Sequence, residues 1–197
     1  MLKGISDNAW RVFIAIELPK EVRDKIAAHV TRLRQLEPDA GASWTRPENI
    51  HLTLKFLGDT PRTQIDKLSE ATSRAVAPFP PFKIGVARSG AFPPRSCPKV
   101  LWVGIDDSEG KLATMQARLD EECSLVGFQK ESRPFRPHLT IARLRKPQDA
   151  RTLATAHKQI QFETMQLDVS EVVVIRSELS SAGSKYTAIT RHPIGPA

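Results

Sequence analysis

Two cysteines and no long apolar run are the clearest shortages of this 197-residue chain. Cys97 and Cys123 stand apart, without the CxxC spacing of a zinc or redox site, so we expect reduced thiols in a cytoplasmic protein. No stretch approaches the ~20 apolar residues of a membrane span, and Met1–Trp10 lacks the apolar segment of a signal peptide. These absences argue against secretion and membrane insertion.

Sequence signatures of phosphate-binding loops and metal sites are missing as well. Neither GxGxxG nor GxxxxGK[ST] occurs anywhere in the chain. No carboxylate or cysteine stands at ligand spacing from the two histidine motifs described below, and zinc sites usually need three or four protein ligands. We therefore expect no metal and no cofactor.

Positive charge is in excess, with a net charge of +7, a pI of about 9.7 and 40% apolar residues. Such a balance is typical of a globular protein with a polyanionic partner. Cations gather around the two histidine motifs; they are Arg46, Lys55, Arg133, Arg136, Arg143, Arg145 and Lys146. This placement predicts an anionic substrate.

The most informative pattern is a short motif that occurs twice, as His51-Leu52-Thr53-Leu54 and His138-Leu139-Thr140-Ile141. In a β-strand, alternate side chains point to opposite faces, so each copy presents His and Thr on one face and two aliphatic residues on the other. Two imidazoles that titrate near neutrality, each beside a hydroxyl group, can pass protons to and from a phosphate ester.

The chain around the motifs repeats with the same offset of 87 residues that separates the two histidines (138 − 51). The equivalent segments are 12–16 with 99–103, 21–36 with 108–123, 62–77 with 149–164 and 83–89 with 170–176. We therefore interpret the chain as one bilobal domain over residues 1–197, with repeat halves of about 11–90 and 98–178 and a final strand at 184–191.

Periodicity and turn residues predict alternating strands and helices. The expected strands are Arg11–Glu17, Ile50–Leu57, Phe82–Ser89, Val100–Ile105, His138–Leu144 and Asp168–Arg176. Helices are expected from Pro19, over about 62–77, over Ser108–Val126 and over about Gln148–His157. Gly58-Asp59 is expected to close the first motif strand. The proline-rich Phe92–Pro98 is expected to be a connector between the halves or a lip beside the site. If the halves face each other, both motif strands share one cleft.

Each candidate residue also has a purely structural interpretation. His51 and His138 could be half-buried strand residues, and Thr53 and Thr140 could be there for β-propensity, but their duplication in register favours function. The remaining histidines, His29, His157 and His192, lie outside the duplicated strand motif and are interpreted as structural or surface residues.

Arg143 lies five residues after His138, and its guanidinium offers a planar fork that matches phosphate oxygens. The equivalent residue of the first half is Phe56, so the two halves differ at this position. Phe56 either belongs to the core or lines the side of the site that would face the base or sugar of a nucleotide. Arg136, two residues before His138, is either a phosphate ligand or part of a solvated face.

These motifs and their flanks resemble the two-histidine (2H) phosphoesterases, and above all the RNA 2′,3′-cyclic phosphodiesterases, historically called 2′-5′ RNA ligases. The resemblance covers nearly the whole chain; it rests on residues 11–16, 49–58, 136–143 and 175–179. It implies an α/β (α+β) bilobal fold, with two pseudosymmetric lobes that each hold an antiparallel-type sheet and flanking helices around a central basic cleft.

The resemblance also implies the reaction, which is hydrolysis of RNA 2′,3′-cyclic phosphate ends to 2′-phosphomonoesters without a metal. His51 would protonate the leaving O3′ and His138 would activate water, while Thr53, Thr140 and Arg143 would bind the phosphate, and Arg136 and Phe56 complete the predicted site. Reversal would give 2′-5′ ligation. The expected partner is RNA with cyclic phosphate ends, with tRNA fragments as one candidate, acted on by a cytoplasmic monomer.

Two other functions fit the same residues. One is a phosphodiesterase for a small cyclic nucleotide or ADP-ribose cyclic phosphate. The other is a non-catalytic module that binds RNA ends, for which loss of either histidine would weaken binding only modestly. Catalysis instead predicts losses of roughly 10²–10⁴-fold in turnover.

Overall fold

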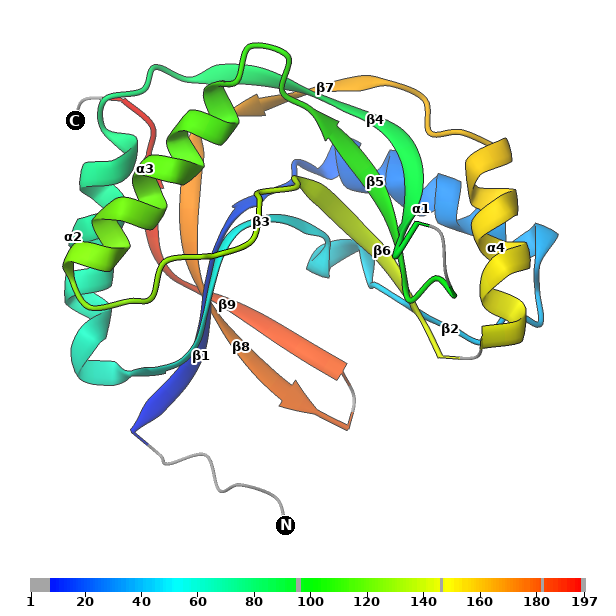
Figure 1. Cartoon of the computed structure of the whole chain (residues 1–197), viewed down its shortest axis with the longest axis horizontal. Coiled ribbons are helices and arrows are strands. Elements are labelled where there is room, and N and C mark those ends of the chain that lie inside the picture. The colour runs from blue at the N-terminus through cyan, green and yellow to red at the C-terminus, as the bar shows by residue number, and fades with distance from the viewer. Residues whose placement is uncertain (1–7, 95–96, 146, 182, 196–197) are drawn as a thin grey trace.

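The computed structural model describes residues 8–94, 97–145, 147–181 and 183–195, and its strands form one curled antiparallel sheet (Figure 1). The strands are β1 (Ala9–Glu17), β2 (Ala42–Trp44), β3 (His51–Pro61), β4 (Phe82–Phe92), β5 (Val100–Asp106), β6 (His138–Leu144), β7 (Met165–Val169), β8 (Glu171–Ser180) and β9 (Gly183–Pro193). Their order is β7-β4-β5-β6-β3-β1-β8-β9, and the short β2 pairs with β6.

The sheet divides into two lobes where β3 meets β6, because a single register pair, Leu52 with Leu139, joins these strands. Read outward from this junction, the first lobe is β3-β1-β8-β9, which holds the first motif, and the second lobe is β6-β5-β4-β7, which holds the second motif. The 87-residue offset equates β3 with β6, β1 with β5 and β8 with β4, so equivalent strands occupy equivalent places. The prediction of two pseudosymmetric antiparallel lobes is confirmed.

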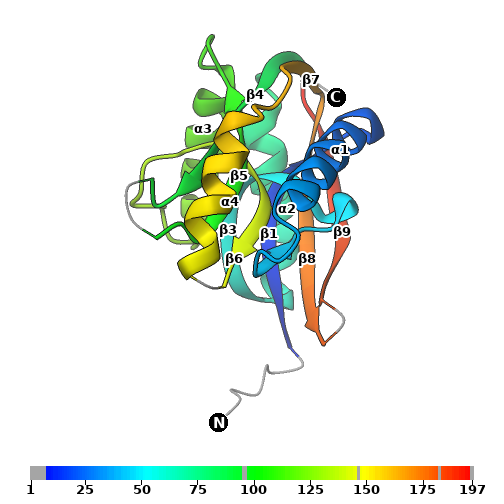
Figure 2. The same cartoon turned by 90° about the vertical axis from the view of Figure 1, so that its right-hand side faces the viewer.

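Four α-helices cover the two lobes; they are α1 (Lys20–Leu36), α2 (Ile65–Val76), α3 (Lys111–Leu125) and α4 (Pro147–Gln159). Helices α2 and α3 pack together behind β3 and β8, whereas α4 packs on β4 and β6 with α1 beside it (Figure 1). Figure 2 views the second lobe from its helical side. Each repeat thus gives one helix and one long strand to the opposite lobe, and the first repeat also gives it the short β2. We infer a single bilobal domain, because neither half of the sequence contains a complete lobe.

One predicted strand, Asp168–Arg176, is in fact two. β7 ends at Val169 and pairs with β4, while β8 begins at Glu171 and pairs with β1 in the other lobe. The segment contains no Gly or Pro, and strand-forming valines stand on both sides of Ser170-Glu171, so these two polar residues are a weak local sign of the crossing.

Two predicted boundaries were also wrong. β3 continues through Gly58, which takes a left-handed φ of 71° at an irregularity in the pairing with β1, instead of ending there. Helix α3 begins at Lys111 and not at Ser108, because the Asp107 carboxylate accepts hydrogen bonds from the backbone N–H groups of Leu112 and Ala113. The connector prediction lies partly outside the described residues, at 95–96.

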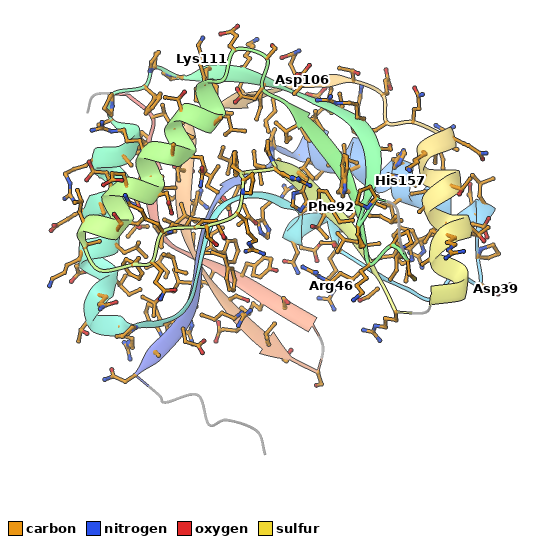
Figure 3. The ribbon with its side chains drawn as sticks, in the orientation of Figure 1. Asp39, Arg46, Phe92, Asp106, Lys111 and His157 are labelled. Carbon is orange, nitrogen blue, oxygen red and sulfur yellow. The ribbon has the colours of Figure 1, made fainter. Side chains whose placement is uncertain are left out.

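The core contains a buried histidine pair between the helices of the second lobe. His29 of α1 lies 2.9 Å from His157 of α4 (Nε2 to Nδ1), and His157 Nε2 lies 2.9 Å from the Trp102 carbonyl oxygen in β5 (Figure 3). Because a carbonyl only accepts, His157 donates from Nε2 and accepts from His29. The pair fixes both helices to the sheet, as the structural interpretation of these histidines predicts.

This pair makes the fold sensitive to acid. Burial, with smaller contributions from His157 and Arg32, lowers the pKa of His29 to about 4, and burial also lowers the pKa of His157. Below pH 6.5 the unfolded chain therefore binds more protons than the folded one, and stability falls as the pH falls from 6.5 towards 4. We expect a lower Tm at pH 5 than at pH 7, with a smaller decrease in His29→Gln. Equal decreases in both proteins would contradict this origin.

Candidate active site

A cleft of about 750 Å³ opens where the two lobes meet, and both His-x-Thr motifs line it. The lining residues come from β1, β2, β3, β6, β8, β9 and the turn before β3; they are Arg11, Phe13, Ser43, Trp44, Thr45, Arg46, Asn49, His51, Thr53, Phe56, His138, Thr140, Arg143, Ser177, Leu179, Gly183, Ser184 and Tyr186. None of them is acidic and three are arginines, Arg11, Arg46 and Arg143, so the charge of the lining is positive.

The two catalytic candidates, His51 and His138, are held in the same way. His51 Nδ1 lies 2.8 Å from the carbonyl oxygen of Asn49, and His138 Nδ1 lies 2.7 Å from that of Arg136. Because these carbonyls only accept, each Nδ1 carries a proton, and Nε2 is left as the atom that can exchange one. Each histidine can therefore act as either proton donor or proton acceptor.

Aromatic rings position both imidazoles. Phe13 stacks on His51 with ring centroids 4.6 Å apart, and Tyr186 meets His51 edge-on at 5.3 Å. Phe92, labelled in Figure 3, meets His138 edge-on at 5.1 Å. Burial lowers the pKa of His51, although the hydrogen bond to the Asn49 carbonyl and the negative charge of Glu17, its cross-strand neighbour, oppose the shift. The free protein thus favours neutral His51.

Matching β-bulges explain why residues five positions after each histidine reach the cleft. Thr53 and Lys55 pair with consecutive residues of β1, and Thr140 and Ala142 with consecutive residues of β5, so Leu54 and Ile141 are extra. An extra residue reverses the alternation of faces beyond it. As a result, Phe56 and Arg143 line the cleft together with Thr53 and Thr140.

The same bulge overturns the expectation for Lys55, whose charge does not serve the cleft. Its side chain is only 3% exposed and forms a buried ion pair with Asp120 of α3. The Lys55 ammonium also donates to the Gln129 carbonyl oxygen at 2.7 Å. Lys55 therefore joins β3 to the helices and the loop behind it.

Most of the predicted basic cluster around the second motif also lies elsewhere. Arg136 is exposed and does not line the cleft; its contribution is the carbonyl that orients His138. Arg133 is bound to Glu131 at 2.9 Å, and Arg145 is exposed outside the cleft lining. Lys146 lies outside the described residues. Arg143 is the member of this cluster that reaches the cleft.

Sequence reasoning missed several lining residues. Trp44 comes from the unpredicted strand β2, and Arg11 and Phe13 come from a strand interpreted only as core. Tyr186, the single tyrosine of the chain, arrives on β9, which has no equivalent in the repeat. The one local signal was Arg11, a charge that interrupts an apolar strand. Among the described residues, no group of three or more His, Cys, Asp or Glu is placed to bind a metal ion.

A bilobal antiparallel sheet that brings one His-x-Thr strand from each lobe into a common cleft defines a two-histidine phosphoesterase. The chain belongs to the 2′-5′ RNA ligase superfamily, whose family model matches residues 22–180.

Relatives agree with this assignment. An RNA 2′,3′-cyclic phosphodiesterase of Methanothermobacter thermautotrophicus is 34% identical over 180 residues, which cover 90% of this chain and 95% of that protein. The protein of that name from Thermotoga maritima is 31% identical over 179 residues, covering 91% and 92%. The apo structure of E. coli LigT superposes with a TM-score of 0.75 at 25% identity, covering 96% and 99%.

Proposed function

We propose that this protein hydrolyses 2′,3′-cyclic phosphate ends of RNA to 2′-phosphomonoesters. The observation that carries the proposal is the pair of equivalently held histidines, each beside a threonine, in a cleft lined by arginine and free of carboxylates. The relatives named RNA 2′,3′-cyclic phosphodiesterase support the substrate class. LigT, which has also been solved with 3′-AMP (TM-score 0.70), supports a nucleotide in this cleft.

The reaction needs one proton acceptor and one proton donor. His138 Nε2 takes a proton from water, and the water oxygen forms a bond to phosphorus. The bond from phosphorus to O3′ then breaks, and His51 Nε2 gives its proton to O3′, which leaves the phosphate on O2′. The Nδ1 bonds to the carbonyls of Asn49 and Arg136 keep both rings oriented.

Thr53, Thr140 and Arg143 hold the phosphate. The two threonine hydroxyls can donate to its non-bridging oxygens from opposite lobes, and the Arg143 guanidinium adds a charged donor. These groups stabilise the extra negative charge of the transition state. A bound phosphate anion also raises the pKa of a neighbouring imidazole, so substrate binding opposes the effect of burial on His51 and favours its protonated form.

Ligation uses the same groups in reverse. When an RNA 5′-hydroxyl replaces water, His51 and His138 exchange roles and a 2′-5′ linkage can form. We expect hydrolysis to dominate, because water is the abundant nucleophile.

Cellular context follows from the same proposal. A monomer is sufficient, because one chain supplies both histidines and both threonines of the cleft. RNA fragments, tRNA fragments among them, carry the phosphate ends that the site would bind. The described structure has no helix long and apolar enough to cross a membrane. Neither Cys97 nor Cys123 is joined in a disulfide in the described structure, which supports a reducing compartment such as the cytoplasm.

The test is incubation of the purified protein, in the presence of EDTA, with an RNA oligonucleotide that ends in a 2′,3′-cyclic phosphate. We expect turnover to a 2′-phosphate end, resolved from the 3′-phosphate isomer by chromatography. A matched RNA with a linear 3′-phosphate should remain unchanged. Bound but unprocessed RNA would favour the binding module, and turnover confined to cyclic mononucleotides would favour the small-nucleotide enzyme.

A further inference from the structure

Arg11 stands out as a cation of the cleft that the proposed chemistry does not use. It is exposed, lines the cleft from β1, and has its guanidinium 4.7 Å from the centre of the Phe56 ring. Its cross-strand neighbour Asp59 forms no ion pair with it, nor does any other carboxylate in the described part of the chain. The charge is therefore available to a ligand.

The stack on Phe56 fixes how this charge is presented. A guanidinium that lies on an aromatic ring uses its flat face for the contact, while its five N–H donors point outward in its own plane. The fork is thus pre-oriented with its donors free. The free donors match the oxygens of a phosphate group. A base is a poorer match, because the guanidinium already covers the face of Phe56 on which a base would stack.

The strand register places Arg11 away from the reacting phosphate. Thr53 pairs with Ala15, Phe56 with Phe13, and Asp59 with Arg11. At about 3.3 Å per residue, the backbone of Arg11 is roughly 13 Å along β1 from the level of Thr53, and Phe56, on which its guanidinium lies, pairs with Phe13 roughly 7 Å from that level. The equivalent position in the other half is Pro98 (11 + 87), so the cleft has this cation on one side only.

We propose that Arg11, held on Phe56, binds the phosphate on the 5′ side of the terminal nucleotide and thereby selects oligonucleotides over cyclic mononucleotides. The inference rests on the proposed hydrolysis of cyclic phosphate ends. It assigns the β1–β3 side of the cleft to the body of the RNA. Leu179, 69% exposed at the end of β8, extends the same wall with an apolar surface beside Ser177.

The experiment compares three substrates: a nucleoside 2′,3′-cyclic phosphate with a free 5′-hydroxyl, a dinucleotide ending in the cyclic phosphate, and the same dinucleotide with an uncharged methylphosphonate linkage. We expect Arg11→Gln to lower kcat/KM for the dinucleotide about tenfold or more, mainly through KM, because it removes a charged hydrogen bond. The other two substrates should change less than twofold. For the wild-type protein, replacing the charged linkage by the methylphosphonate should lower kcat/KM by about the same factor as Arg11→Gln lowers it for the charged dinucleotide.

Arg62→Gln is the matched control. Arg62 also stacks on an aromatic ring, 4.9 Å from Trp10, but it does not line the cleft, so all three substrates should retain their rates. The salt dependence gives a second reading, since losing one phosphate contact should reduce the slope of log kcat/KM against log salt by about 0.7 for the dinucleotide.

Several results would overturn the inference. If Arg11→Gln lowered kcat/KM equally for all three substrates, Arg11 would act at the reacting phosphate or in the fold. If Arg11→Gln lowered kcat/KM for the methylphosphonate as much as for the charged dinucleotide, Arg11 would contact a base or sugar instead of the linking phosphate. An unchanged dinucleotide rate would deny it any role. Absence of wild-type turnover on every cyclic phosphate would instead overturn the proposed function, and this inference would fall with it.

Discussion

Replacing His51 or His138 by alanine is expected to reduce kcat/KM on a cyclic-phosphate RNA by roughly 10²–10⁴-fold each, because each supplies one of the two proton transfers. The double variant should be less active than either single variant. Its total loss of activity should be smaller than the product of the two single losses, because the histidines act as a unit. The measurement is initial rate against substrate concentration.

Two controls separate catalysis from folding and binding. His192→Asn changes a buried histidine of β9 that does not line the cleft, and it should retain turnover. The product, an RNA with a 2′-phosphate end, should bind both alanine variants within about tenfold of the wild type, because Thr53, Thr140 and Arg143 remain. A histidine variant with normal rates would remove that residue from the mechanism.

Lys55→Met is expected to cost about 3–5 kcal/mol of stability, because it leaves the Asp120 carboxylate partly buried without its cation. For a chain of this size the decrease in Tm is then roughly 6–20 °C, measured by thermal unfolding at pH 7. Below the transition, activity should stay within about threefold of the wild type, since Lys55 faces away from the cleft.

The control for this prediction is Lys20→Met, which breaks an exposed ion pair between Lys20 and Asp24. That change should alter stability by less than about 1 kcal/mol. Should Lys55→Met cost as little, the buried pair would not support the fold. Loss of activity without loss of stability would return Lys55 to the site, as its position in the sequence suggested.

The sequence alone determined the repeat and the chemistry it carries. An offset of 87 residues aligned both motifs with their flanking strands and helices, and period-two alternation put His51 and Thr53 on one face, with Leu52 and Leu54 in the core. Their equivalents in β6 show the same burial pattern. Such features are local or periodic, so one sequence is enough to detect them.

Tertiary structure decided how the repeats combine. Pairing of Leu52 with Leu139 brings the motif strands together, and the crossing at Ser170 sends β8 to the first lobe. These are long-range strand pairings, which depend on the whole sheet, and the polar Ser170-Glu171 step between valines does not by itself show to which lobe each strand goes. The exchange of helices between lobes has the same origin.

The side-chain directions near the site were likewise decided by tertiary pairing. A bulge at Leu54 sends Lys55 to Asp120 and Phe56 to the cleft, and the bulge at Ile141 sends Arg143 there. Both depend on how a neighbouring strand is paired, which alternation cannot anticipate. The sequence therefore named the two histidines and two threonines, whereas only the folded sheet showed which cations line the cleft.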